Sequence, residues 1–129
     1  MKKSLIALIN CFIFFSCNDA QEKAYEKLNE EVMALHDKIM PKTEDLVTLK
    51  GKLDSFAKGP DSIHVKKLQI ALSKADESMM DWMHHYSLDS LEKMSISDKI
   101  SYLTKQINQL SSIEKQTDST INAAKNYVK

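Results

Sequence analysis

Residues 25–56 read YEKLNEEVMALHDKIMPKTEDLVTLKGKLDSF, and in this stretch apolar side chains recur at alternating steps of three and four residues. Such steps place the apolar side chains in one stripe along a single face of a helix. The spacing therefore predicts one long amphipathic helix over about residues 21–57. The stripe comprises Tyr25, Leu28, Val32, Leu35, Ile39, Leu46, Leu49, Leu53 and Phe56, with Lys42 as a polar lapse.

Pro41 falls inside this predicted helix. A proline has no N–H to donate and clashes with the carbonyl group four residues earlier, at a cost of about 3 kcal/mol, so the helix must either break or kink there. Because the apolar spacing stays in phase from Ile39 to Leu46, we expect a kink.

A second apolar stripe follows the turn at residues 58–62, which read KGPDS. Glycine typically ends a helix and Asp or Ser typically begins one, so Gly59 is expected to end the first helix and Asp61 or Ser62 to cap the second. The stripe predicts a second helix over about residues 62–86. It comprises Val65, Leu68, Leu72, Ala75, Met79, Trp82 and Tyr86.

A third stripe runs from Ile96 to Val128, after a polar connection that is expected to hold one short turn around Leu88 and Leu91. Ser95 and Asp98 have the spacing of a capping box, which predicts the start of the third helix. Glu114 and Thr117 interrupt the stripe. These lapses predict that the end of this helix is loosely packed or extends past its partners.

The three stripes need one another, because a single amphipathic helix cannot bury its apolar face alone. The sequence carries no strand signal and no internal repeat. It predicts an all-α fold: an up-down-up three-helix antiparallel bundle over residues 23–129, with a Pro-kinked long first helix, preceded by a cleavable signal peptide.

That signal peptide is predicted over residues 1–16, where Lys2 and Lys3 precede an apolar run that ends at Phe15. The run is about 12 residues long and falls short of the ~20 that a permanent membrane helix needs. Residues 14–17, FFSC, resemble a bacterial lipobox, with Phe14 in place of the usual leucine. This resemblance implies cleavage before Cys17, a diacylglyceryl group on the Cys17 sulfur, and a short lipidated tether at residues 17–22.

Removal of residues 1–16 leaves 16 Lys against 18 acidic residues. Since an acidic protein is not attracted to an anionic bilayer, attachment is expected to depend on the acyl chains. The five residues after Cys17 reach at most about 18 Å, which would hold the domain close to the membrane. We therefore expect a cell-envelope location, lipid-anchored to a bacterial membrane and periplasmic or surface-facing.

The composition argues against several functions. All 18 basic residues are Lys and the formal net charge is zero, which disfavours nucleic-acid binding, and two glycines cannot build a nucleotide-phosphate cradle. No catalytic motif is present, and neighbouring helical residues point about 100° apart, so Asp37 is not expected to orient the His36 ring. We therefore predict that the protein is not an enzyme and has no cofactor, with a protein partner as its possible ligand.

Methionines and histidines gather in two short windows that would face each other if the first two helices form a hairpin, with Met40 level with Met79. Thioether and imidazole ligands together favour Cu(I), and a b-type haem held by one Met and one His is a variant of this idea. The alternatives are that these methionines fill the core beside Pro41 and Trp82, or that they form a partner-binding patch. The candidate metal ligands are Met33, His36, Met40, Met80 and His84.

Residues 31–42, EVMALHDKIMPK, and residues 79–83, MMDWM, resemble a group of small uncharacterised lipoproteins of Bacteroidetes-type bacteria. Some of these carry the label "viral A-type inclusion protein", which reflects a coiled-coil-like composition. The resemblance implies secretion and a helical fold and supplies no activity. The sequence thus predicts a membrane-anchored extracytoplasmic helical-bundle lipoprotein with a structural or protein-interaction role; the alternative is a copper- or haem-binding periplasmic lipoprotein.

Overall fold

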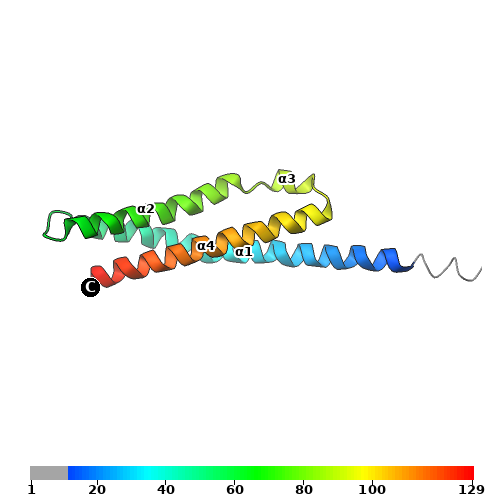
Figure 1. Cartoon of the computed structure of the whole chain (residues 1–129), viewed down its shortest axis with the longest axis horizontal. Coiled ribbons are helices and arrows are strands. Elements are labelled where there is room, and N and C mark those ends of the chain that lie inside the picture. The colour runs from blue at the N-terminus through cyan, green and yellow to red at the C-terminus, as the bar shows by residue number, and fades with distance from the viewer. Residues whose placement is uncertain (1–11) are drawn as a thin grey trace, which may run out of the picture.

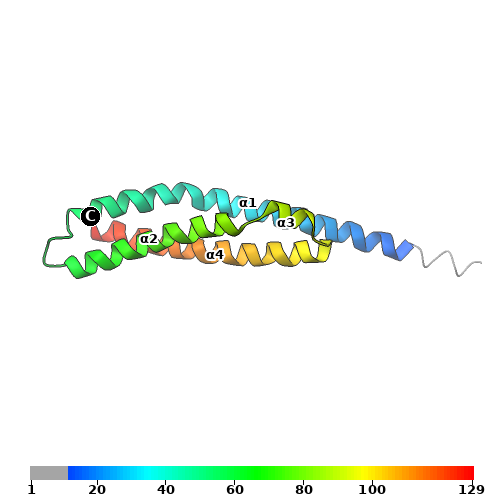
Figure 2. The same ribbon diagram turned by 90° about the horizontal axis from the view of Figure 1, so that it is seen from above.

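The computed structural model describes residues 12–129, with side chains from residue 18 onward, and this part of the chain is entirely helix, turn and loop. It contains α1 (Phe12–Asp54), α2 (Ser62–His85), α3 (Leu88–Glu92) and α4 (Ile96–Tyr127). Figures 1 and 2 show α1, α2 and α4 side by side, with α3 in the connection between α2 and α4. The all-α prediction is confirmed, and the short α3 is the turn expected around Leu88 and Leu91.

Helix α1 differs from its predicted bounds at both ends. It is already helical at Phe12 and ends at Asp54, so Phe56 lies outside it and is 42% exposed. The helix runs through Pro41 without a break, and Figure 2 shows it bowed along its length. The prediction that Pro41 does not break the helix is therefore confirmed, whereas a kink localised at Pro41 stays a prediction.

The helix caps agree only in part with the sequence. The Ser95 hydroxyl accepts a hydrogen bond from the Asp98 backbone N–H at 3.2 Å and donates one to the Asp98 carboxylate at 2.6 Å, which confirms the capping box of α4. Asp61 occupies the N-cap position of α2, as predicted, although its side chain makes no capping hydrogen bond.

The core divides into two clusters, and α1, α2 and α4 contribute to both. The distal cluster lies toward the α1–α2 turn, where Figures 1 and 2 also place the C-terminus. It contains Leu46, Leu49, Leu53, Val65, Leu68, Leu72, Ala75, Ile121 and Ala124. The proximal cluster lies toward the N-terminal end of α1 and contains Val32, Ile39, Met79, Trp82, Leu91, Leu103, Leu110 and Ile113.

The C-terminal half of α4 is well packed, contrary to the expectation of a loose end. Thr117 and Ala124 are completely buried and Ile121 is 6% exposed, since this end of α4 packs against the α1–α2 hairpin in the distal cluster. The polar lapses Glu114 and Thr117 therefore do not loosen the packing of this end of α4.

The N-terminal end of α1 extends beyond the other helices in both views (Figures 1 and 2). Residues 18–24 are all exposed and helical, and we call them the stem. Contact with the body begins at Tyr25, whose ring centroid lies 5.1 Å from the Lys99 Nζ. The predicted tether at residues 17–22 is thus part of α1, whereas residues 1–11 of the predicted signal peptide lie outside the described residues. Among the helices described, none is long and apolar enough to cross a membrane.

Candidate functional site

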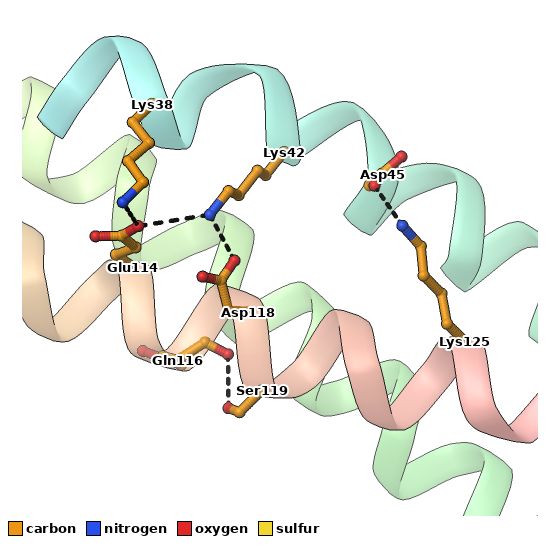
Figure 3. Close-up of polar contacts among 8 residues, drawn as sticks. All are labelled: Lys38, Lys42, Asp45, Glu114, Gln116, Asp118, Ser119 and Lys125. Atoms are coloured by element: carbon orange, nitrogen blue, oxygen red, sulfur yellow. Dashed lines mark hydrogen bonds and ion pairs between the residues drawn. The ribbon is translucent and has the colours of Figure 1, made fainter. Parts of the chain in front are cut away.

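The interface between α1 and α4 is joined by ion pairs (Figure 3). The Glu114 carboxylate lies 2.7 Å from the Lys38 Nζ and 3.6 Å from the Lys42 Nζ, and Lys42 also lies 2.6 Å from the Asp118 carboxylate. The hydrogen bond to Glu114 raises the pKa of Lys38 above its ordinary value. Lys42 and Glu114, the polar lapses of their two stripes, therefore compensate each other across this interface.

The interface between α2 and α4 is hollow instead, with a groove of about 670 Å³. Trp82 and Gln106 line it and are both 7% exposed. This groove is not apparent from the sequence, because a glutamine within an amphipathic helix is ordinarily assigned to the solvent side. The remaining lining is mainly polar: Ser78, Asp81, His85, Tyr102, Lys105, Gln109, Ser112, Ile113 and Gln116.

The third interface, between α1 and α2, leaves apolar side chains exposed. Val47 of α1 and Ser73 of α2 line the same hollow of about 210 Å³. Residues seven apart lie on nearly the same side of a helix. Met33 and Met40 therefore share the stripe of Val47, and Met80 shares the stripe of Ser73. We call this surface the open face; it consists of Met33, Met40 and Val47 on α1 and of Ile63, Lys66, Ile70, Ser73, Glu77, Met80 and His84 on α2.

The candidate metal ligands of α1 lie at or beside the open face. His36 is half-buried, with its ring centroid 6.0 Å from that of Trp82, which brings the two predicted windows to the same level of the bundle. Met40 packs against the proximal cluster, whereas Met33 is 43% exposed. Core packing therefore accounts for Met40 and leaves Met33 available.

The candidate ligands of α2 are more exposed. Met80 is 43% exposed, and the exposed His84 has its Nδ1 2.8 Å from the Met80 carbonyl oxygen. Since a carbonyl oxygen can only accept, this Nδ1 carries the proton and the Nε2 keeps a free lone pair. His84 can thus present its Nε2 to a ligand.

The relation between His36 and Asp37 was predicted wrongly. The His36 Nδ1 lies 2.9 Å from the Asp37 carboxylate, although the two residues are adjacent in α1. The side chains bend toward each other despite the angle between their Cα–Cβ bonds. A carboxylate on Nδ1 fixes the ring and leaves Nε2 as the acceptor, which is the arrangement that orients many metal-binding histidines.

An aromatic group stands beside this site. Trp82 stacks on Tyr86 with ring centroids 4.9 Å apart, and Tyr86 lies 6.1 Å from Tyr102. The Trp82 Nε1 and the Tyr86 hydroxyl are buried and lack a hydrogen-bond partner. Burial of the phenol also raises the pKa of Tyr86, with smaller contributions from Tyr102 and Tyr25. The Met/His residues therefore lie beside aromatic rings, two of which carry a buried polar atom without a hydrogen-bond partner.

A site made only of His, Cys, Asp and Glu is not found: no group of three such side chains in residues 18–129 could hold a metal ion. Such a site has no thioether ligand, so copper or haem binding by the Met/His residues stays a prediction. Cys17 belongs to α1, and its lipidation is likewise a prediction.

No family model, curated protein or solved structure matches this chain. The resemblance of residues 31–42 and 79–83 to small bacterial lipoproteins therefore remains a prediction.

Proposed function

We propose that this protein is a lipoprotein of the bacterial cell envelope, lipidated on Cys17 after cleavage of residues 1–16, with a structural or protein-interaction role. Its body would be an up-down-up three-helix bundle in which α3 belongs to the connection between α2 and α4.

The stem is the observation that supports this proposal. Residues 18–24 are helical and exposed, and they begin directly after Cys17. Seven helical residues span about 10 Å, shorter than the same residues in extended form. A lipid on Cys17 would therefore hold the bundle on a short, stiff spacer.

The anchor can be tested with the two cysteines of the chain. In a bacterial host, Cys17→Ser should abolish incorporation of a radiolabelled fatty acid and leave the protein soluble or unprocessed. Cys11→Ser is the matched control, because it removes the other cysteine and should leave labelling and membrane retention unchanged. Fatty-acid labelling that survives Cys17→Ser would contradict the proposal.

A copper- or haem-binding role is the second candidate, and the protonated Nδ1 atoms of His36 and His84 favour it. Donation from Nδ1 leaves Nε2 of both histidines as an acceptor, and Met33 and Met80, one helical turn earlier in the sequence than His36 and His84, are each 43% exposed. Residues 18–129 titrated with Cu(I) under reducing conditions, and separately with haem, should bind with a fixed stoichiometry that His36→Ala and Met33→Leu abolish. His64→Ala is the control, since His64 lies beside Tyr127 at the opposite end of the bundle. Binding that is unchanged in both site variants would exclude this site.

A further inference from the structure

The open face leaves large apolar side chains in solvent along much of the bundle. Val47 is 62% exposed, Ile70 is 47% exposed, and Met33 and Met80 are each 43% exposed. No segment of the described chain covers them. From Met33 to Val47 this stripe runs for about 21 Å, or four helical turns, which is long enough for helix-on-helix packing.

Charge along the bundle is distributed unevenly. Residues 46–75, which form the distal part of the α1–α2 hairpin, contain six Lys against two acidic residues. Residues 18–45 contain four Lys against eight acidic residues. All six lysines of the distal hairpin are exposed, and none forms an ion pair within the described chain. The distal hairpin is therefore basic and residues 18–45 of α1 are acidic, and three of the distal lysines, Lys50, Lys66 and Lys74, line a hollow with Ile70 of the open face.

We propose that the open face binds a second copy of this chain in an antiparallel arrangement. A two-fold axis across the bundle places α1 against α1 and α2 against α2 of the other copy, so that each basic end meets an acidic end. The open face of the second copy thus matches this face in length and complements it in charge.

One register of the two antiparallel copies brings exposed apolar side chains together on both α1 and α2. The contact between His36 and Trp82 sets which residues of α1 and α2 are level. When Met40 is placed against Val47 of the second copy, the same shift brings Ile70 against Met80. It also aligns two oppositely charged pairs of exposed residues at or beside this face: Asp37 with Lys50, and Glu77 with Lys74.

A parallel pair fits poorly. A two-fold axis along the bundle places α1 against α2 of the second copy at the same level. Lys50 would then lie near Lys66 of the second copy, so like charges would meet at the basic end of the face. Such juxtapositions oppose association.

The antiparallel pair has a consequence that rests on the proposed lipid anchor, although the self-association itself does not. The two stems would point in opposite directions, so that the pair would join two membrane surfaces that face each other.

The first test uses charge reversal in residues 18–129, a fragment that contains both core clusters and neither cysteine. Sedimentation equilibrium should detect dimers of the wild-type fragment. The basic-to-acidic variant Lys50→Glu/Lys74→Glu and the acidic-to-basic variant Asp37→Lys/Glu77→Lys should each self-associate at least ten-fold more weakly. An equimolar mixture should restore dimers, because each reversed end then meets its opposite.

Apolar and orientation controls complete the design. Val47→Glu/Ile70→Glu should abolish dimers, whereas Leu88→Glu, at an equally exposed residue of α3, should leave them unchanged. Fluorescence energy transfer can then report the orientation of the two copies. Transfer between a dye at Ala24→Cys in one copy and a dye at Ser55→Cys in the other should exceed transfer between two copies labelled at Ser55→Cys, because an antiparallel pair places opposite ends together.

Four results would overturn the proposal: a wild-type fragment that stays monomeric to about 1 mM, charge variants that dimerise like wild type, a mixture that fails to restore dimers, or stronger transfer between equal ends. A monomer that binds anionic vesicles through the same lysines would assign the face to a membrane and would also overturn it.

Discussion

The distal and proximal clusters are built from the same three helices but from different kinds of side chain. The distal cluster is aliphatic throughout its buried members. The proximal cluster contains Met79 and Trp82, and Met40, Met83 and Tyr86 pack against it. Two of the three buried polar atoms without a partner, Trp82 Nε1 and Tyr86 OH, lie in this half.

This difference in side chains indicates that the distal half is packed for stability and the proximal half for adaptable contacts. Aliphatic side chains have well-defined rotamers and no polar atoms to satisfy, whereas methionine is flexible and fills irregular space. A buried polar atom without a partner costs about 1–3 kcal/mol. The distal half therefore stabilises the hairpin, and the proximal half, which holds the Met/His residues, carries the features expected of a binding site.

The largest test of this contrast compares one core substitution in each half. Leu72 is 1% exposed in the distal cluster. Leu72→Ala should lower the unfolding free energy by about 3 kcal/mol, because the shortened side chain leaves a cavity. Met79 is buried in the proximal cluster. Met79→Leu should lower the unfolding free energy by less than about 1.5 kcal/mol, since the side-chain volume is conserved. Urea denaturation of residues 18–129 measures both. Equal losses would show that the proximal core is as tightly specified as the distal one.

The boundary between the halves offers a stabilising change. Thr117 is completely buried, and its hydroxyl has no hydrogen-bond partner. Thr117→Val keeps the shape and removes the unsatisfied hydroxyl, so it should raise the unfolding free energy by about 1 kcal/mol. Thr104→Val is the control, because the exposed Thr104 hydroxyl donates to the Ile100 carbonyl at 2.8 Å, and its effect should be near zero. A destabilised Thr117→Val variant would indicate that the hydroxyl does have a partner.

The apolar spacing was enough to predict the helices of the body and the level at which His36 meets the second helix. Spacing alone could not show that Lys42 and Glu114 compensate each other. Each residue by itself interrupts a stripe, and only the register of α1 against α4 brings the two side chains within 3.6 Å.

The candidate site was less predictable than the fold. The hydrogen bond from His36 to Asp37 depends on side-chain rotamers, which backbone geometry does not fix. The groove beside Gln106 depends on how closely α2 and α4 approach, which the sequence pattern does not specify. Residues 18–20 of the stem were missed, because no apolar stripe reaches them and Asn18 and Asp19 have low helix propensity.

A smaller effect tests the ion pairs that link α1 to α4 near the boundary. Lys42→Met should lower the unfolding free energy by about 1 kcal/mol, because it leaves the Asp118 carboxylate without its cation and Glu114 with only Lys38. Lys125→Met is the matched control in the distal half, where the Lys125–Asp45 pair is about half exposed and should be worth less than about 0.5 kcal/mol. Urea denaturation at low salt and at 1 M NaCl checks both; a Lys42→Met loss unaffected by salt would point to packing rather than charge.

The smallest effect is expected from the buried phenol of the proximal half, and it depends on pH. Because burial raises the pKa of Tyr86 above its ordinary value of about 10, the folded state favours the neutral phenol. The stabilisation that the neutral Tyr86 phenol contributes to the unfolding free energy is therefore fully present below pH 10. It is lost as the pH rises through the folded-state pKa. Tyr86→Phe removes this ionisation, so unfolding free energies measured between pH 8 and pH 11 should fall less steeply than in the wild type. At pH 7 the same substitution should be close to neutral, since the hydroxyl has no partner to lose. A variant that loses stability at pH 7 would mean that the phenol is hydrogen-bonded, and the proximal half would then be as well satisfied as the distal half.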